Sequence, residues 1–122
     1  TMNLMYRTSH VDRYRLLHIR RLFWLYNKLS TKEMTMNFEI ELDFYFDEAP
    51  KTLDEVSARI VEQISALHIS SEVRALNVIG PGGGNPNAIV TFNTIKDTMK
   101  YLVHHTGSEK EAIDMCVFIK II

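Results

Sequence analysis

The sequence predicts an α+β fold over residues 36–122, with the element order β-α-β-β-α-β. Three features support this prediction: a strictly alternating stretch at 38–47, two amphipathic helical stretches, and a glycine-rich turn between two β-branched runs. A chain of 122 residues with 46% hydrophobic residues is sufficient for one modest core. We therefore expect one folded domain at 36–122, preceded by a separate segment at 1–35.

The first predicted strand has one apolar and one mainly acidic face. The apolar positions are Phe38, Ile40, Leu42, Phe44 and Phe46. The positions between them are Glu39, Glu41, Asp43, Tyr45 and Asp47. This period of two is typical of a strand that buries one face. Ala49-Pro50 then ends the strand, because proline cannot donate a ladder hydrogen bond.

A helix is predicted from about 53 to 68. Residues 52–55 have the Thr-x-x-Glu spacing of a capping box, in which each side chain accepts a backbone N–H of the first turn. The apolar residues that follow lie at steps of three and four and share one stripe of a helix. They are Leu53, Val56, Ile60, Ile64 and Leu67.

The remaining elements are two strands, a second helix and a last strand. Runs 73–79 and 88–92 flank eight residues rich in glycine and proline, which predicts a hairpin with a long tip. Asn93 or Thr94 can cap the second helix, and Gly107 fits the left-handed residue at its end. Residues 113–121 alternate again and predict the last strand.

This element order is that of a ferredoxin-like sandwich, in which right-handed crossovers place both helices on one face of a four-stranded antiparallel sheet. The other face is then open. It should display Glu39, Glu41, Asp43, Tyr45, Asp47, Ile89, Thr91, Asn93, Cys116, Phe118 and Lys120. Two interpretations stay open: an ordinary solvated face, or a surface that binds a protein.

Charge divides the chain into a basic arm and an acidic body. Residues 1–35 contain seven basic and two acidic residues, a net charge of +5, whereas 36–122 contain seven basic and thirteen acidic residues, a net charge of −6. Within 10–29, apolar residues fall on one arc and basic residues on the other, which predicts an amphipathic helix. The members that matter for binding are Arg20, Arg21, Leu22, Trp24 and Leu25.

This arm has several candidate partners. Opposite charges favour docking of the 10–29 helix on the acidic sheet face of the same chain or of a second copy, which would form a homodimer. Nucleic acid is a second candidate partner for its arginines. Trp24, within the basic arc, suits an anchor at a membrane surface or partner, or packing against a neighbouring chain. The pattern also resembles a mitochondrial presequence, and Met34 and Met36 leave open a native start beside the first strand.

No catalytic, cofactor-binding or metal-binding constellation is evident. The 80–87 loop leads into a strand and lacks the Lys-Ser/Thr of a P-loop, although its glycine N–H groups could form an anion nest. His104 and His105 are adjacent on the second helix and point in different directions, so they suit a helix end better than a metal. Cys116 is predicted to be a small, packed hydrophobic side chain rather than a nucleophile.

Two resemblances accompany this pattern. Residues 87–92 and 94–102 resemble the third strand and second helix of RNA-recognition motif domains, but Asn87 and Ile89 stand where that family has base-stacking aromatics. The hairpin Gly-Pro-Gly-Gly-Gly-Asn-Pro resembles one in small, uncharacterised bacteriophage proteins, which implies no activity.

The sequence therefore predicts a non-enzymatic interaction module, with a phage-encoded accessory protein that modulates a host protein as one form of it. A nucleic-acid-binding accessory protein acting through the basic arm is the alternative. A lone cysteine, no secretory signal and no apolar run long enough to span a bilayer predict a cytoplasmic location.

Overall fold

The computed structural model describes residues 36–122 and five isolated positions, 17, 18, 20, 21 and 24. Its helices and strands are β1 (Phe38–Asp43), α2 (Leu53–Ser65), β2 (Ser71–Asn77), β3 (Asn87–Phe92), α3 (Ile95–Thr106), α4 (Glu109–Met115) and β4 (Lys120–Ile121). Two short 3-10 helices, η2 (Pro81–Gly83) and η3 (Cys116–Phe118), complete the order.

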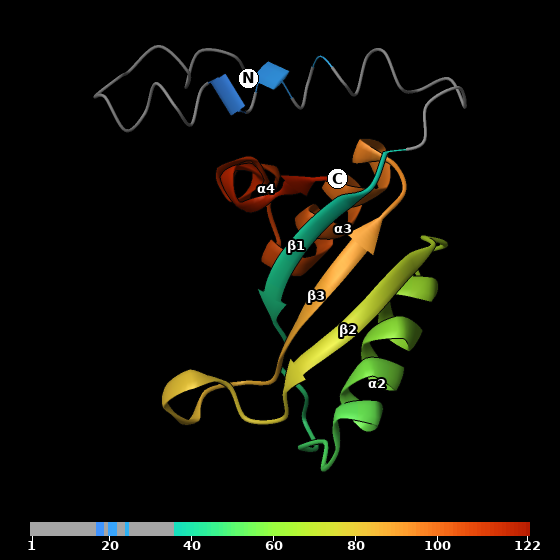
Figure 1. Ribbon diagram of the computed structural model, residues 1–122, viewed down its shortest axis with the longest axis vertical. Helices are drawn as coiled ribbons and strands as arrows, with labels where there is room; N and C mark the ends of the chain where they lie inside the picture. Colours follow the sequence, from blue (N-terminus) through green and yellow to red (C-terminus); the bar gives the residue numbers. More distant parts are fainter. Residues whose placement is uncertain (1–16, 19, 22–23, 25–35) are drawn as a thin grey trace.

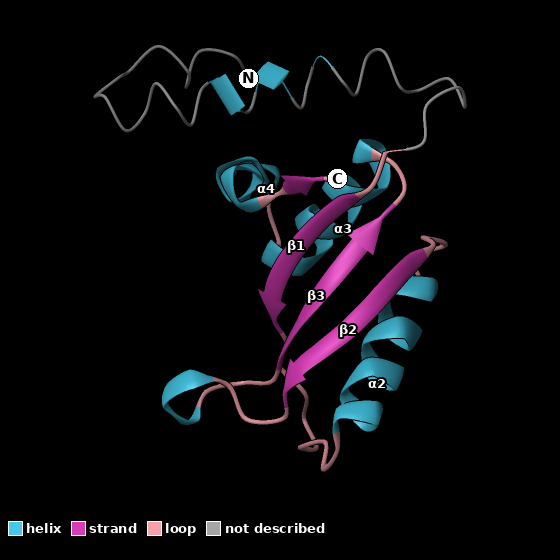
Figure 2. Ribbon diagram, in the orientation of Figure 1, coloured by secondary structure: helices cyan, strands magenta, loops and turns pink. Residues whose placement is uncertain are grey.

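The four strands form one antiparallel sheet in the spatial order β2-β3-β1-β4. In Figure 1, α3 lies behind β1 and β3, α4 lies to the left of the upper part of β1, and α2 runs beside β2; Figure 2 shows the same arrangement coloured by type of element. The described chain is thus an α+β fold with a four-stranded antiparallel sheet and three α-helices. It is compatible with the predicted ferredoxin-like arrangement.

The apolar face of β1 forms the centre of the core, as its alternation predicts. Phe38, Ile40 and Leu42 are buried against the inner side chains of β3 and of the helices. β1 is shorter than predicted and ends at Asp43. Phe44 still donates its N–H to the carbonyl of Pro86 (2.8 Å), so the chain stays extended beside the hairpin for one residue more.

Helix α2 begins as predicted but its cap differs in detail. The Thr52 hydroxyl accepts the Glu55 N–H (3.1 Å), as in a capping box. The Glu55 carboxylate, however, accepts the N–H of Lys51 (2.7 Å) rather than that of Thr52. The helix ends at Ser65, three residues before the predicted end, and His68 adopts a left-handed conformation (φ 60°).

Replacing Thr52 by alanine should lower the free energy of unfolding by about 0.5–2 kcal/mol, because the Glu55 N–H loses its acceptor. Thr52→Ser keeps that acceptor and is the matched control. Urea melts of both variants measure the difference. Equal midpoints for the alanine and serine variants would mean that the hydroxyl contributes nothing to the start of α2.

The predicted limits of the second helix are confirmed in α3. Thr94, rather than Asn93, is the cap, and its hydroxyl accepts the Asp97 N–H (3.0 Å). At the other end, Gly107 lies in the left-handed region (φ 86°) and donates its N–H to Val103. Glycine suits this position because a side chain would strain that backbone conformation.

The last predicted element is wrong over most of its length. Residues 109–115 form helix α4, residues 116–118 form η3, and only Lys120 and Ile121 form a strand. Ser108 caps α4 by accepting the Glu111 N–H (3.1 Å). The residues that α4 and the following turns bury are spaced by four and three, as in a helix: Ala112, Cys116 and Ile119.

The predicted helix at 10–29 lies mostly outside the described residues. The five described positions in this range, Leu17, His18, Arg20, Arg21 and Trp24, are assigned to a helix. Leu22 and Leu25 are outside the described residues. Within the part of the chain that the structure describes, no helix is both long and apolar enough to cross a membrane.

Candidate functional site

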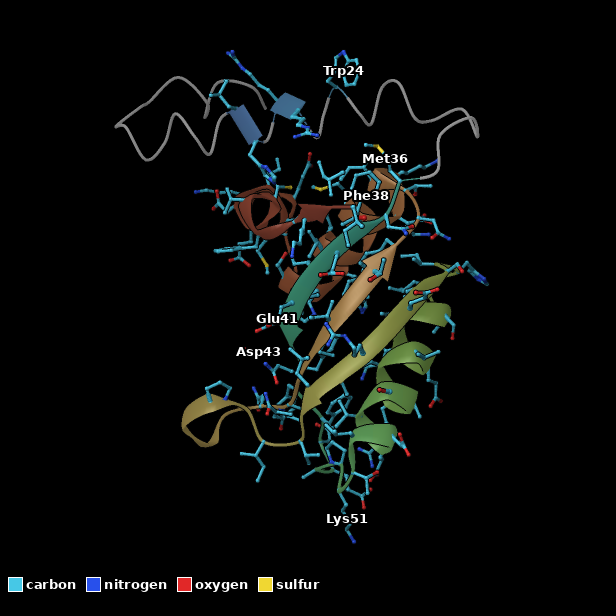
Figure 3. All side chains as sticks on the ribbon, in the orientation of Figure 1. Trp24, Met36, Phe38, Glu41, Asp43 and Lys51 are labelled. Carbon is cyan, nitrogen blue, oxygen red and sulfur yellow. The ribbon has the colours of Figure 1, made fainter. Side chains whose placement is uncertain are left out.

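The open face of the sheet carries a row of three carboxylates on the central strand β1. Glu39, Glu41 and Asp43 alternate with the buried side chains of that strand, so all three stand on the face away from the helices. Glu41 and Asp43 are exposed and lie toward the lower end of β1 (Figure 3). This part of the prediction, that β1 gives the face its acidic centre, agrees with the structure.

The sheet register identifies the neighbours of these acids. Glu39 lies between Lys120 of β4 and Thr91 of β3. Glu41 is paired with Ile89 of β3. Lys120 therefore places one basic side chain opposite the first acid of the row, and β4 ends before it can supply another for Glu41 or Asp43.

Among the described residues, no ion pair within 4.0 Å joins the acids of the row to a basic side chain, although the register places Arg74 of β2 in line with Glu41, one strand further away. Arg59 forms an ion pair with Glu55 (2.6 Å), but both residues belong to α2. Glu41 accepts a long hydrogen bond from the Asn87 amide (3.4 Å), and Asn87 in turn accepts one from Asn77 (2.9 Å). The face therefore presents negative charge to whatever approaches it.

Three residues predicted for this face lie elsewhere. Cys116 is 1% exposed on the helical side, since η3 replaces the predicted strand; burial raises the pKa of its thiol to about 12, so it is not a reactive thiolate. Asp47 follows the end of β1 and lines a hollow beside α2. Phe118 belongs to η3 rather than to a strand, yet it is 67% exposed, as a binding residue should be.

Tyr45 and the described residues of the arm are accessible. Tyr45 follows β1 and is 72% exposed, the largest exposure among the large apolar side chains of the described residues. Arg20 and Arg21 are exposed, and Trp24 is 58% exposed. These side chains are free to meet a partner, but only Glu39, Glu41 and Asp43 are brought together by the sheet.

A second polar cluster, which the sequence did not reveal, lies where β1 meets the end of α3. The Tyr101 hydroxyl is 3.1 Å from Nδ1 of His105, and the His105 ring packs edge-on against Phe44 with 5.2 Å between ring centroids. Together with Asp43 and His104 these residues line a hollow of about 300 Å³. The i,i+4 spacing of Tyr101 and His105 was the available signal.

Burial governs the chemistry of this cluster. Desolvation raises the pKa of Tyr101 to about 12. Desolvation, and secondarily the neighbouring His104, lowers the pKa of His105 below its ordinary 6.5, although the Asp43 charge and a hydrogen bond to the Asp43 backbone oppose that shift. At neutral pH, His105 is therefore a neutral, hydrogen-bonded member of the core edge, which favours a structural role.

The lowered pKa of His105 predicts a loss of stability in acid. The His105 ring binds a proton more readily in the unfolded chain than in the folded one. Its contribution to the free energy of unfolding is therefore complete above pH 6.5 and is lost as the pH falls through the folded-state pKa. Urea melts at about pH 7.5 and pH 5 should show a smaller loss for His105→Gln than for the wild type. His68→Asn is the control, because His68 is an exposed histidine and asparagine tolerates its left-handed backbone conformation. Equal losses in the wild type and His105→Gln would contradict this role.

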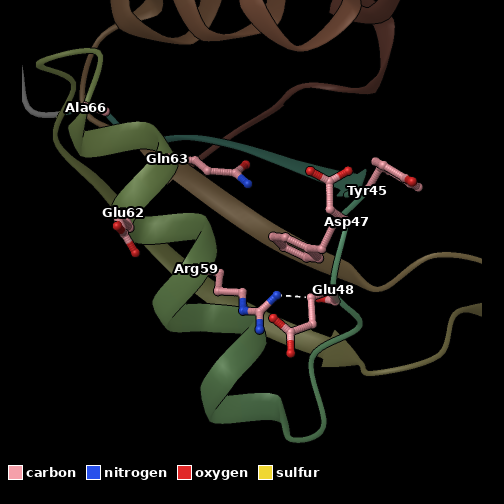
Figure 4. Close-up of a pocket in the computed structure, with 8 residues that line it drawn as sticks. Tyr45, Asp47, Glu48, Arg59, Glu62, Gln63 and Ala66 are labelled. Atoms are coloured by element: carbon pink, nitrogen blue, oxygen red, sulfur yellow. Dashed lines mark hydrogen bonds between the residues drawn. The ribbon is translucent and has the colours of Figure 1, made fainter.

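A larger hollow, about 620 Å³, lies beside α2 and is shown in Figure 4. Its walls include Asp47, Glu48 and Glu62, with Arg59 between them. Arg59 is already engaged: it donates to the Glu48 carbonyl and the Glu55 carboxylate and lies 5.7 Å above the Phe46 ring. The hollow has no free cation for an anionic ligand, and nothing in its geometry defines a reaction.

The glycine-rich hairpin tip is a compact turn. Gly80 and Gly84 face each other as an isolated bridge, with the Gly80 N–H donated to the Gly84 carbonyl (2.9 Å). A Cβ on Gly80 would collide with the Asn85 carbonyl, so this position requires glycine for close backbone approach. The turn itself thus explains the glycine at position 80 without a bound anion.

Metal ligands and relatives add no further constraint. Among the described residues, no three His, Cys, Asp or Glu side chains are placed to hold a metal ion together. The chain matches no protein-family model, no curated protein and no solved structure.

Proposed function

We propose that this protein is a non-enzymatic protein-interaction module that binds a basic protein surface through the open face of its sheet. One observation carries the proposal: Glu39, Glu41 and Asp43 stand in a row on a central strand, and the acids at 41 and 43 have no basic residue opposite them on β4. Like charges held in a row repel one another and are relieved by a basic partner. Exposed Tyr45 at the end of the row adds the kind of aromatic side chain that is enriched in interfaces.

The module has a ferredoxin-like form in this proposal, with the basic segment at 1–35 as an attached arm. Two sources of basic surface are compatible with the charge pattern: another protein, including a host protein if the chain is phage-encoded, and the arm of a second copy. The net charges of +5 and −6 favour either. Light scattering of the full chain separates them, because only the second makes a dimer.

Affinity capture from the native cell tests the proposal when the face is altered. The double variant Glu41→Lys with Asp43→Lys reverses the row, and Asp54→Lys with Glu109→Lys makes the same change in net charge at exposed helix starts. The wild type and the helix variant should retain the same partner, and the row variant should lose it at least tenfold. Equal capture by all three would reject the acidic row as the binding surface.

A second candidate, nucleic-acid binding by the arm, is favoured by one observation. Arg20, Arg21 and Trp24 are all exposed in helix-assigned positions, which suits phosphate contacts and base stacking. Arg20→Glu with Arg21→Glu should then weaken retention on nucleic acid and reduce its dependence on salt. Retention that is unchanged in this variant would exclude this function for the two arginines.

A further inference from the structure

The lower half of β1 has a free backbone edge, which follows from the hydrogen-bond pattern of the sheet. In an antiparallel sheet the N–H and C=O of one residue point to the same neighbouring strand, and those of the next residue point to the opposite one. Phe44 donates to Pro86, on the β3 side, whereas Asn37 exchanges hydrogen bonds with Ile122, on the β4 side (3.1 and 2.9 Å). Even-numbered residues of β1 therefore face β3, and odd-numbered residues face β4.

Glu39 has a partner on that side, and Glu41 and Asp43 do not. β4 pairs Lys120 with Glu39, but residues 116–118, which precede β4 and would lie opposite Glu41 and Asp43 in a longer strand, form η3 instead. Among the described residues, no backbone group bonds to the outward N–H and C=O of Glu41 or to the Asp43 N–H. The Asp43 backbone already forms a hydrogen bond with the His105 side chain. Unpaired groups of this kind are a template for another strand.

The existing partner of this edge indicates which residues an added strand should carry. Directly opposite residues on neighbouring antiparallel strands place their side chains on the same face, and opposite charges there stabilise the pair. β4 already follows this rule with Lys120 opposite Glu39. Extended along the free part of β1, the same rule requires basic residues opposite Glu41 and Asp43, two positions apart.

We propose that the Glu41–Asp43 edge of β1 binds an extended segment of another protein that carries Lys or Arg at alternate positions, as an added strand beside β1 and in line with β4. This inference rests on the proposed protein-binding function and adds its mode and its partner. The backbone hydrogen bonds hold the segment, and the two acids select basic residues on it. Because the free edge is only a few residues long, the contact is a weak and reversible one.

The test uses two peptides and the full chain. The probe is the capped peptide Thr-Lys-Thr-Lys-Thr-Lys-Thr, and the matched control has Glu in place of each Lys. NMR titration should show binding of the lysine peptide alone, with slower exchange of the Glu41 and Asp43 amides when it is bound. Binding that leaves both amides exchanging as before, or no binding of the lysine peptide, would overturn strand addition.

Two substitutions at one position separate the backbone from the charge. Glu41→Gln removes the charge and keeps the N–H, whereas Glu41→Pro removes both; proline is tolerated here because this N–H faces away from β3. The proline variant should bind the lysine peptide about threefold to tenfold more weakly than the glutamine variant, the equivalent of one hydrogen bond. Thermal melts confirm that both variants are folded.

The results also separate this inference from the function on which it rests. Equal affinities of the two variants, both below that of the wild type, would overturn strand addition and leave charge-based binding by the acidic face in place. If the row variant loses its cellular partner and Glu41→Pro retains it as well as Glu41→Gln does, the inference fails alone. A larger loss with Glu41→Pro supports both.

Discussion

Replacing Phe92 by alanine is expected to lower the free energy of unfolding by about 3–5 kcal/mol, which is a large part of the stability of a small domain. Phe92 is fully buried at the end of β3, and its ring centroid is 5.6 Å from that of Tyr101 on α3. The truncation removes apolar burial and leaves a cavity between the sheet and α3, because the surrounding core can collapse only in part.

Phe118→Ala is the matched control, since the same atoms are removed from a side chain that is 67% exposed. Its unfolding free energy should stay within about 0.5 kcal/mol of the wild type. Urea denaturation of the full chain measures both. A loss of unfolding free energy for Phe118→Ala comparable to that for Phe92→Ala would contradict the exposure of the Phe118 side chain on η3.

Replacing Ala112 by aspartate should cost about 3–5 kcal/mol, because an unpaired carboxylate would be forced into the core. Ala112 is fully buried on α4, among core residues that include Cys116 and Ile119. In the arrangement predicted from the sequence, this residue would precede a strand that starts at Ile113, at a position without any assigned burial. The variant therefore distinguishes a packed helix α4 from the predicted strand.

Lys110→Asp places the same side chain two residues earlier in α4, at an exposed position. It should change stability by no more than about 1 kcal/mol, as expected for a surface charge in the first helical turn. Circular dichroism at 222 nm together with urea melts follows both variants. Equal, small effects of the two substitutions would contradict the burial of Ala112.

The elements with strong local signals were predicted from the sequence because several signals agreed. For α2, the Thr52 cap and the apolar stripe indicate the same start; for α3, Thr94 and Gly107 mark both ends. The alternation in β1 correctly separated Glu39, Glu41 and Asp43 from the buried face. Each of these features depends on neighbours within a few residues, which is the range that sequence patterns describe.

Residues 113–121 were misassigned because their composition fits two periods. Ile113, Met115, Val117, Ile119 and Ile121 alternate as in a strand, but Ala112, Cys116 and Ile119 repeat as in a helix. The Ser108-x-x-Glu111 spacing has the form of the Thr52 cap and was the signal that favours a helix. Tertiary packing decides between helix and strand here, because it buries Ala112, Cys116 and Ile119. That packing cannot be read from the local pattern of a single sequence.

The features of the candidate site that depend on contacts between distant residues were the least predictable. β4 begins only at Lys120, because residues 116–118 form η3, and this late start leaves the edge of β1 unpaired beside Glu41 and Asp43. The approach of His105 to Asp43 depends on where α3 ends relative to β1. Both features depend on contacts of β1 with segments roughly sixty or more residues away in the sequence. Residue periodicity describes single elements and does not predict such contacts.

Amide hydrogen exchange of free β1 tests the central claim most directly, namely that the acidic strand offers an unpaired edge to a partner. The amides of Ile40 and Leu42, which face β3, and that of Glu39, which faces Lys120, should exchange slowly, whereas those of Glu41 and Asp43 should exchange fast. NMR of the full chain resolves each amide in one experiment. Protection of Glu41 and Asp43 equal to that of Ile40 and Leu42 would show that the edge is already paired, and would contradict the proposed binding site.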